Sequence, residues 1–394
     1  MFDLVPQNCQ TPRIAVFGVG GCGCNTIKQL SLSPLGDNVE LIAVNTDAQS
    51  LLISNSSTRL QIGPETTKGL GAGARPQKGF EAAEESQAAL REHIELADII
   101  FVTGGMGGGT GTGAIPFMAA IAKDLNKPLV AVVTTPFSFE GHQRGLLAQN
   151  GVDDLMQHAS AVIVLPNDQL VKALDKKVSI VNAFYESNRI LQDVLQGLTT
   201  TISQSGLINI DLNDFIAVVS HQGRAAMGVA RQVAGEDLQL TINKALKNPL
   251  LEEVKLSKAK GAIVSVMATE SIELSQYNSI GETLQQQLDP SALVIIGLTI
   301  VPELDCELEL MVIATGIQEG AESEFEIFTE LQQPKVTKSQ DQIQTKSHNE
   351  RFDANELVNL HDFLKQKSTS SANEDHGDDE LEIPTYTRNQ RAVN

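Results

Sequence analysis

Residues 104–113 read GGMGGGTGTG, and this stretch decides the fold of the chain. It directly follows the apolar run DIIFV at 98–102 and opens a helical pattern over 113–125. Glycines let the backbone turn sharply and approach a ligand closely, and the free N–H groups at a helix start suit a phosphate. The stretch lacks the lysine and the spacing of the Walker phosphate loop. Its place after a predicted strand favours a phosphate-binding loop over a flexible linker.

Short apolar runs alternate with helical stretches around this loop. Runs rich in Val and Ile such as 98–102 are typical of strands covered on both faces. Strand–helix alternation predicts right-handed crossovers and an α/β fold with a doubly wound, mostly parallel sheet. The other predicted strands are 13–17, 40–44, 129–133 and 161–165, and a helix is predicted over 80–94.

The pattern changes in the second half of the chain. Apolar residues at helical spacing predict one long central helix near 179–203. Strands at 262–267, 292–299 and 308–314, with helices at about 236–247 and 279–287, predict a second, smaller α/β sheet. Polar residues then dominate, which is typical of disorder. The predicted division is a flexible N-terminus (1–12), a phosphate-binding domain (13–178), the central helix (179–205), a C-terminal domain (206–317), a disordered linker (318–378) and a terminal peptide (379–394).

Composition excludes several function classes. The formal net charge of −20 over 394 residues argues against nucleic-acid binding and against direct attraction to anionic lipids. We find no apolar stretch near the roughly 20 residues that a membrane span needs, and no secretory signal. The four cysteines fit neither a disulfide framework nor a zinc site. We therefore expect a cytoplasmic protein with no nucleic-acid partner, no membrane insertion and no metal held by side chains.

Two further glycine-rich stretches accompany the first. Residues 18–25 (GVGGCGCN) also lie at a predicted strand-to-helix turn, although alone they resemble many dinucleotide-binding and unrelated turns. Together with 104–113 they suggest a polyphosphate held from two sides. Residues 69–74 (GLGAGA) could form a third such loop, but a plain surface loop would explain them equally if the other two were absent.

Residues 206–214 (GLINIDLND) carry two carboxylates at the junction of the predicted domains. If a helix begins near Asn209, Asp211 and Asp214 share one face of its first turn. Such a pair could orient a water and help hold a hydrated Mg²⁺. Helix capping with favourable charge at a helix start explains the same residues at least as well.

Two smaller pairs have the spacing of one helical turn. Glu140 and Arg144 could reach a sugar or phosphate, and Phe184 and Asn188 could stack on a base and read its edge. For each pair taken alone, core packing or an ordinary surface contact is the commoner explanation.

These motifs, in this order, resemble the FtsZ family, the bacterial relatives of tubulin. The resemblance is most specific at 104–113, extends from about Ile14 to Ile317, and resumes at Asp379–Gln390, which is similar to the family's terminal docking peptide. It implies a GTP-dependent GTPase whose subunits stack head to tail into filaments of the division ring. It also implies GTP or GDP with Mg²⁺ held mainly by phosphates and water. The implied location is mid-cell at the inner membrane face, with membrane-tethering partners such as FtsA or ZipA.

The resemblance also assigns roles to single residues. Asn209, Asp211 and Asp214 would complete the site of the neighbouring subunit as its catalytic residues. Glu140 and Arg144 match ribose and phosphate contacts, and Phe184 and Asn188 match base contacts. The loop residues expected around the nucleotide are Gly20, Gly21, Cys22, Asn25, Gly71, Ala72, Gly73, Gly107, Gly108, Gly109, Thr110, Gly111 and Thr112.

Two departures from the family pattern keep alternatives open. Cys22 and Cys24 stand where the family usually has glycines, and they could change nucleotide affinity or sensitivity to thiol reagents. One alternative is therefore a diverged filament protein that binds GTP and hardly hydrolyses it. Another is a nicotinamide-dependent oxidoreductase, suggested by the loop at 18–25 and by Asp47 after the second strand. Residues 104–113 have no place in that alternative.

Overall fold

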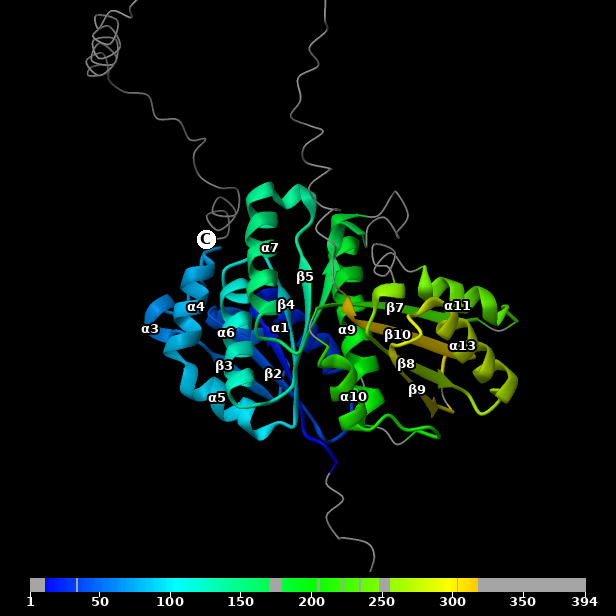
Figure 1. The fold of residues 1–394 in the computed structure, drawn as a ribbon. Coiled ribbons are helices and arrows are strands. Elements are labelled where there is room, and N and C mark those ends of the chain that lie inside the picture. The colour runs from blue at the N-terminus through cyan, green and yellow to red at the C-terminus, as the bar shows by residue number, and fades with distance from the viewer. Residues whose placement is uncertain are drawn as a thin grey trace, which may run out of the picture. The chain divides into compact units, whose positions relative to one another are not determined.

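A ten-stranded sheet runs through the computed structural model (Figure 1). The structure describes residues 11–32, 35–169, 179–203, 206–221, 223–233, 235–247, 256–302 and 304–317, all within one compact unit. In order across the sheet, the strands are β3 (Thr58–Gln61), β2 (Val39–Asn45), β1 (Ile14–Val19), β4 (Ile99–Gly105), β5 (Leu129–Thr135), β6 (Ala161–Pro166), β7 (Arg224–Gln232), β10 (Leu308–Ile317), β8 (Gly261–Ala268) and β9 (Leu293–Ile300).

The half of the sheet from β3 to β6 is parallel throughout, which confirms the predicted doubly wound arrangement. Helices pack on both of its faces (Figure 1). They are α1 (Gly20–Leu30), α2 (Ala48–Ile53), α3 (Pro64–Thr67), α4 (Pro76–Glu85), α5 (Gln87–Leu96), α6 (Thr110–Asp124), α7 (His142–Met156) and the long central helix α9 (Ile180–Ser203).

Strand β4 shows why its sequence is apolar without interruption. Successive side chains of a strand point to opposite faces of the sheet. Ile99 and Phe101 enter the core shared with α1 and α9, whereas Ile100 and Val102 enter the core under α4, α5, α6 and α7. Because both faces are covered, all four residues Ile99–Val102 are buried.

The second half of the chain differs from the prediction in one respect. Its strands do not form a separate sheet, because β7 pairs with β6 through Val162–Arg224 and Ile163–Ala225. Beyond this short parallel seam, β10 is antiparallel to β7 and β8, and β8 is parallel to β9. Helices α10 (Leu212–Val219), α11 (Leu238–Leu246) and α13 (Leu274–Gln287) accompany these strands.

Two predicted helix boundaries are also wrong. The single helix expected over 80–94 is the pair α4 and α5, which meet at Ser86. The Ser86 hydroxyl accepts a hydrogen bond from the backbone N–H of Gly63 at 3.0 Å, which ties the break to a neighbouring turn. Helix α10 begins at Leu212 rather than near Asn209, because Asp211 in extended conformation forms its N-cap.

Parts of the predicted division lie outside the described residues. These are residues 1–10, the linker at 318–378 and the terminal peptide at 379–394. Within the described ranges, none of the helices combines the length and the apolar character that crossing a bilayer requires.

Candidate functional site

A pocket of about 340 Å³ opens at the carboxyl edge of the parallel strands, where β1, β4 and β5 end. This is the edge at which open α/β sheets bind ligands. The predicted site residues that line it are Gly20, Gly21, Cys22, Asn25, Gly108, Gly109, Thr110, Gly111, Glu140, Arg144, Phe184 and Asn188.

Two helix N-termini meet at this pocket. Helix α1 starts at Gly20 and α6 starts at Thr110, and a side-chain carbon built on Gly20 would lie only 3.4 Å from the backbone N of Gly111. Among the described residues, no side chain caps either helix, and neither helix has an acidic residue in its first turn. Their free N–H groups and dipoles therefore both favour an anion in the same place.

The glycine-rich loop between β4 and α6 is braced by its own threonines. Gly107 has φ +90°, a conformation that favours glycine, and its N–H donates to the Thr112 hydroxyl at 2.8 Å. Thr112 is buried, and neither it nor Gly107 lines the pocket, so these two hold the loop rather than face the ligand space. Thr110 does line the pocket, and its hydroxyl lies 2.7 Å from the hydroxyl of Thr46.

The predicted loop at 69–74 supports the glycine-rich loop at 104–113 instead of lining the pocket. Gly71, Ala72 and Gly73 are not among the lining residues. The Gly71 N–H donates to the carbonyl of Thr46 at 3.3 Å. A side-chain carbon built on Gly109 would come within 2.7 Å of the Ala72 methyl group, so the two loops are in direct contact.

Glu140 and Arg144 form an ion pair at the pocket rim. Glu140 ends a short 3₁₀ turn (Ser138–Glu140), and Arg144 lies in the first turn of α7. Their closest N–O distance is 2.5 Å, and Glu140 also accepts from the N–H of Phe137 at 2.9 Å. The Arg144 Nε donates to the carbonyl of Gly107 at 3.5 Å, which points this cation toward the glycine-rich loop.

The opposite wall of the pocket comes from α9. Phe184 is 40% exposed and meets the ring of Phe137 edge-on at 4.9 Å between centroids. Phe139 lies 6.5 Å from Phe184 and stacks on Phe137. Asn188, one turn further along α9, lines the same wall. An aromatic ring and an amide one turn apart suit a planar, hydrogen-bonding ligand group.

Three polar lining residues were not among the residues predicted from sequence. Thr134 lies at the end of β5, Asn167 directly follows β6, and Ser187 precedes Asn188 on α9. The Ser187 hydroxyl donates to the Asn167 side chain at 2.6 Å. Their position in the sequence could have predicted them, because polar residues at the carboxyl ends of parallel strands lie at the edge of the sheet where ligands bind.

The predicted catalytic residues lie away from this pocket, beyond the far end of α9. From Asn188 to Ser203 the helix alone spans about 22 Å at 1.5 Å per residue. Asn209 accepts from the N–H of Gly206 at 2.6 Å, and Asp211 caps α10 by accepting from the N–H of Asp214 at 2.7 Å. Asn209, Asp211 and Asp214 are all exposed. One copy of the chain does not bring them to its own pocket.

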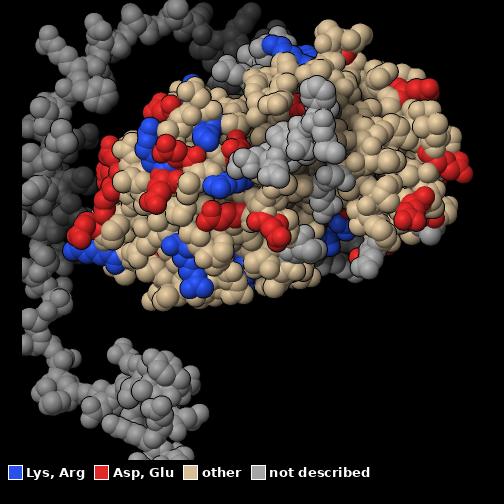
Figure 2. Space-filling view, turned by 90° about the horizontal axis from the view of Figure 1, so that it is seen from below, with Lys and Arg blue, Asp and Glu red and all other residues tan. Residues whose placement is uncertain are grey.

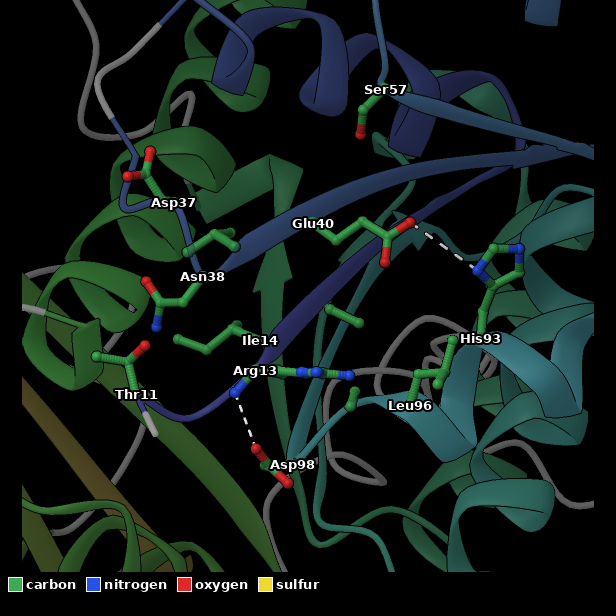
Figure 3. A pocket seen from close by; sticks show the side chains of 13 residues that line it. Thr11, Arg13, Ile14, Asp37, Asn38, Glu40, Ser57, His93, Leu96 and Asp98 are labelled. Carbon is green, nitrogen blue, oxygen red and sulfur yellow. Dashed lines mark hydrogen bonds and ion pairs between the residues drawn. The ribbon is translucent and has the colours of Figure 1, made fainter. Parts of the chain in front are cut away.

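A larger hollow of about 670 Å³ lies at the amino edge of the same strands (Figure 3). The carboxylates of Asp37, Glu40 and Asp98 line it against the single guanidinium of Arg13, so it suits an anion poorly. His93 lies 3.9 Å from Glu40, and the backbone N–H of Arg13 donates to Asp98 at 2.9 Å (Figure 3). The molecule seen from below shows interspersed acidic and basic side chains (Figure 2).

Asp47, the residue that suggested an oxidoreductase, has a structural role instead. It is the N-cap of α2 and accepts from the N–H groups of Gln49 at 2.9 Å and Ser50 at 3.4 Å. It does not line the pocket. The structure therefore gives no support to a ribose contact through this carboxylate.

Burial sets the protonation state of the two cysteines in the loop at 18–25. It raises the pKa of the Cys22 thiol, with a smaller opposing effect of a hydrogen bond with Thr134. It raises the pKa of Cys24 to about 12, against a hydrogen bond with Asn45. Both groups are therefore thiols, not thiolates, at neutral pH.

Comparisons with known proteins agree with this geometry. Residues 13–175 match the model of the Tubulin/FtsZ family GTPase domain, and residues 223–318 match that of the FtsZ family C-terminal domain. The chain is 37% identical over 377 residues to the cell division protein FtsZ of Wigglesworthia glossinidia brevipalpis, covering 96% of each chain. It is 35% identical to that of Pseudomonas aeruginosa, covering 99% of this chain and 100% of the other.

Solved structures give the same result. An FtsZ dimer from M. jannaschii superposes with a TM-score of 0.75 at 35% identity, covering 79% of this chain and 90% of that one. CetZ1 from Haloferax volcanii, at 21% identity and a TM-score of 0.67, shares the fold. The two domain models, the relatives aligned over nearly the full length and the pocket between two uncapped helix starts together show that the chain belongs to the tubulin/FtsZ family of GTPases.

Proposed function

We propose that the pocket at the carboxyl edge binds GTP and GDP with the phosphates at the starts of α1 and α6 and the guanine against α9. The two uncapped helix starts are the observation that carries this placement, because their N–H groups and dipoles converge on one point. Arg144 adds a positive charge on the rim, Glu140 is placed for the ribose, and Phe184 and Asn188 are placed for the base.

Mg²⁺ is proposed to accompany the nucleotide and to neutralise charge on its phosphates. This cation prefers oxygen ligands and usually keeps several waters. The hydroxyl oxygen of Thr110, a residue of the pocket lining, fits that preference. The remaining ligands would be phosphate oxygens and water.

The chain is a GTP-dependent, filament-forming GTPase of cell division, and we place hydrolysis at the contact between two copies. Asp211 and Asp214 are exposed, follow the C-terminal end of α9 and do not line the pocket. Head-to-tail stacking would bring them to the nucleotide of the next copy. One oxygen of Asp211 caps α10, and the other can accept a hydrogen bond from the attacking water. Asn209 and Asp214 would help to orient that water, so catalysis would depend on positioning and electrostatics.

The proposed setting is the division ring at mid-cell, on the cytoplasmic face of the membrane. A short peptide at residues 379–390, which lies outside the described residues, would bind membrane-tethering division proteins such as FtsA or ZipA. The support for this step is the apolar-plus-proline pattern of that peptide at the end of a polar segment.

The test measures phosphate release from GTP over a range of protein concentrations, with pelleting followed on the same samples. Release per subunit should rise steeply at the concentration where pelleting begins. The Asp211→Asn variant keeps the capping oxygen but loses the charge. It should bind GTP normally and pellet, yet release little phosphate.

Asp237→Asn is the matched control, because Asp237 is also an N-cap, for α11, and accepts from the N–H of Gln239 at 3.2 Å. It should hydrolyse GTP like the unchanged chain. Equal turnover in both variants would remove Asp211 from the mechanism. Pelleting of the unchanged chain without phosphate release would support the weakly hydrolysing filament protein instead.

A further inference from the structure

Cys22 occupies a place in the pocket that calls for a role of its own. It is the third residue of α1, between the phosphate end of the pocket and the wall formed by α9. Its Sγ lies 3.8 Å from the Oγ1 of Thr134 and 3.8 Å from the Oδ1 of Asn188. The thiol therefore links the strand β5 side of the pocket to the residue placed for the base.

The surroundings of Cys22 hold its side chain in place. A side-chain carbon built on Gly105 would lie 3.2 Å from the Cβ of Cys22 and 3.7 Å from its Sγ, so the thiol packs directly over the bare backbone of β4. The backbone carbonyl of Cys22 accepts from the Thr26 hydroxyl at 3.2 Å. Because burial raises the pKa of this thiol, it keeps its hydrogen at neutral pH and can act as a donor.

The acceptor of the Cys22 hydrogen, Oδ1 of Asn188, matters for base recognition. An asparagine amide can present either its oxygen or its NH₂ group to a ligand, and its surroundings decide which. A thiol donating to Oδ1 favours the orientation that leaves the second lone pair of that oxygen for the ligand. The guanine edge offers N–H donors at N1 and N2, whereas adenine has an acceptor at N1. An oxygen that faces N1 and N2 therefore suits guanine and opposes adenine, whose amino donor lies at N6 instead.

We propose that Cys22 is a positioning residue for base selection, whose S–H fixes the Asn188 amide with its oxygen available to guanine. This inference rests on the proposed placement of the base against α9. A glycine, the usual residue of the family at this position, has no side chain to donate this hydrogen bond. Cys22 would therefore take a direct part in discriminating GTP from ATP.

The experiment compares the binding of GDP and ADP by equilibrium titration at protein concentrations below assembly, and reads the ratio of the two dissociation constants. Diphosphates avoid hydrolysis during the measurement. Cys22→Ala keeps the Cβ and removes the donor, and it should lower the preference for GDP about three- to tenfold, the usual range for one lost hydrogen bond. Cys22→Ser restores a donor and should keep the preference within about twofold of the unchanged chain.

Cys24→Ala is the matched control, because that thiol lies two residues further on and contacts the carbonyls of Gly18 and Val44 instead of Asn188. Its preference for GDP should equal that of the unchanged chain. Thermal unfolding of each variant establishes that it is folded before it is titrated. An unchanged preference in Cys22→Ala, or a loss in Cys22→Ser as large as in Cys22→Ala, would overturn the inference.

Asn188→Ala separates this inference from the function on which it rests. If that variant loses the preference for GDP while Cys22→Ala keeps it, the base contact stands and only the role of Cys22 fails. If Asn188→Ala keeps the preference as well, the proposed base placement itself fails.

Discussion

Gly79 offers a sharp test of how the phosphate-binding loop is held. It lies in the middle of α4, where glycine lowers helix stability by roughly 1 kcal/mol relative to alanine, so propensity alone predicts that Gly79→Ala stabilises the protein. The structure predicts the reverse. An added Cβ would lie 2.2 Å from the carbonyl oxygen of Gly109 and 3.2 Å from the Cα of Thr110.

The size of the effect follows from that overlap. Ordinary contact begins at 3.4 Å, so 3.4 − 2.2 = 1.2 Å must be relieved by moving α4 or the loop. Overpacking of this kind costs about 1–3 kcal/mol, and after the helix gain of roughly 1 kcal/mol we expect a net loss of about 1 kcal/mol. The melting temperature should fall by roughly 2–4 °C. Because Gly109 lines the pocket, GDP affinity should fall at least about tenfold.

The assay is thermal unfolding with and without GDP, together with GDP titration. Gly145→Ala in α7 is the matched control, because a Cβ there meets no atom within 4 Å. It should raise stability by up to about 1 kcal/mol. If Gly79→Ala behaves like Gly145→Ala in both assays, the close approach of α4 to the loop does not hold the loop in place.

Three further outcomes are expected. Arg231→Met should destabilise the fold by about 1–3 kcal/mol in urea unfolding, because it removes the partner of the largely buried Glu309 carboxylate, which the half-exposed Arg231 contacts at 2.6 Å. A loss below about 0.5 kcal/mol would contradict this. Burial raises the pKa of Asp193, so the folded state keeps a proton that the unfolded chain has lost, and stability should fall as pH rises from about 4 through the raised pKa. Thermal unfolding of Asp193→Asn across the same pH range should lack this fall in stability. The same fall in the variant would contradict the assignment to Asp193. Burial raises the pKa of Cys24 to about 12, so iodoacetamide at pH 8 should label it far more slowly in the native than in the unfolded chain, and equal rates in peptide mass spectrometry would show that it is exposed.

The sequence predicted five of the six strands in the parallel half because their signals are local, whereas the short strand β3 was not predicted. Five apolar runs near the start of the chain are strands, since burial on both faces requires uninterrupted Val and Ile. Strand β7 was missed because RAAMGVARQ is rich in alanine and charge, and its place in the sheet depends on pairing with β10, which is distant in sequence. The joining of the two sheets by the β6–β7 seam is likewise a long-range contact.

For the candidate site too, the features with a local sequence signal were predicted, and those that depend on the three-dimensional arrangement were not. Glycine loops are recognisable from sequence, so Gly20, Gly108 and Thr110 were placed at the pocket. Thr112 and the third loop were expected beside the ligand, but the structure uses them as braces. Which member of a glycine-rich run faces the ligand depends on backbone angles such as the φ of Gly107, which spacing does not encode.

The separation of pocket and aspartates along α9 has an arithmetic consequence. Under the proposed head-to-tail stacking, a row of n copies contains n − 1 complete sites, because one terminal copy has a pocket without a neighbour and the other has aspartates without a nucleotide to meet. A pair would turn over GTP at half the rate per copy of a long row. Specific activity would then measure mean filament length, and the two ends of each filament would differ chemically although every subunit is identical.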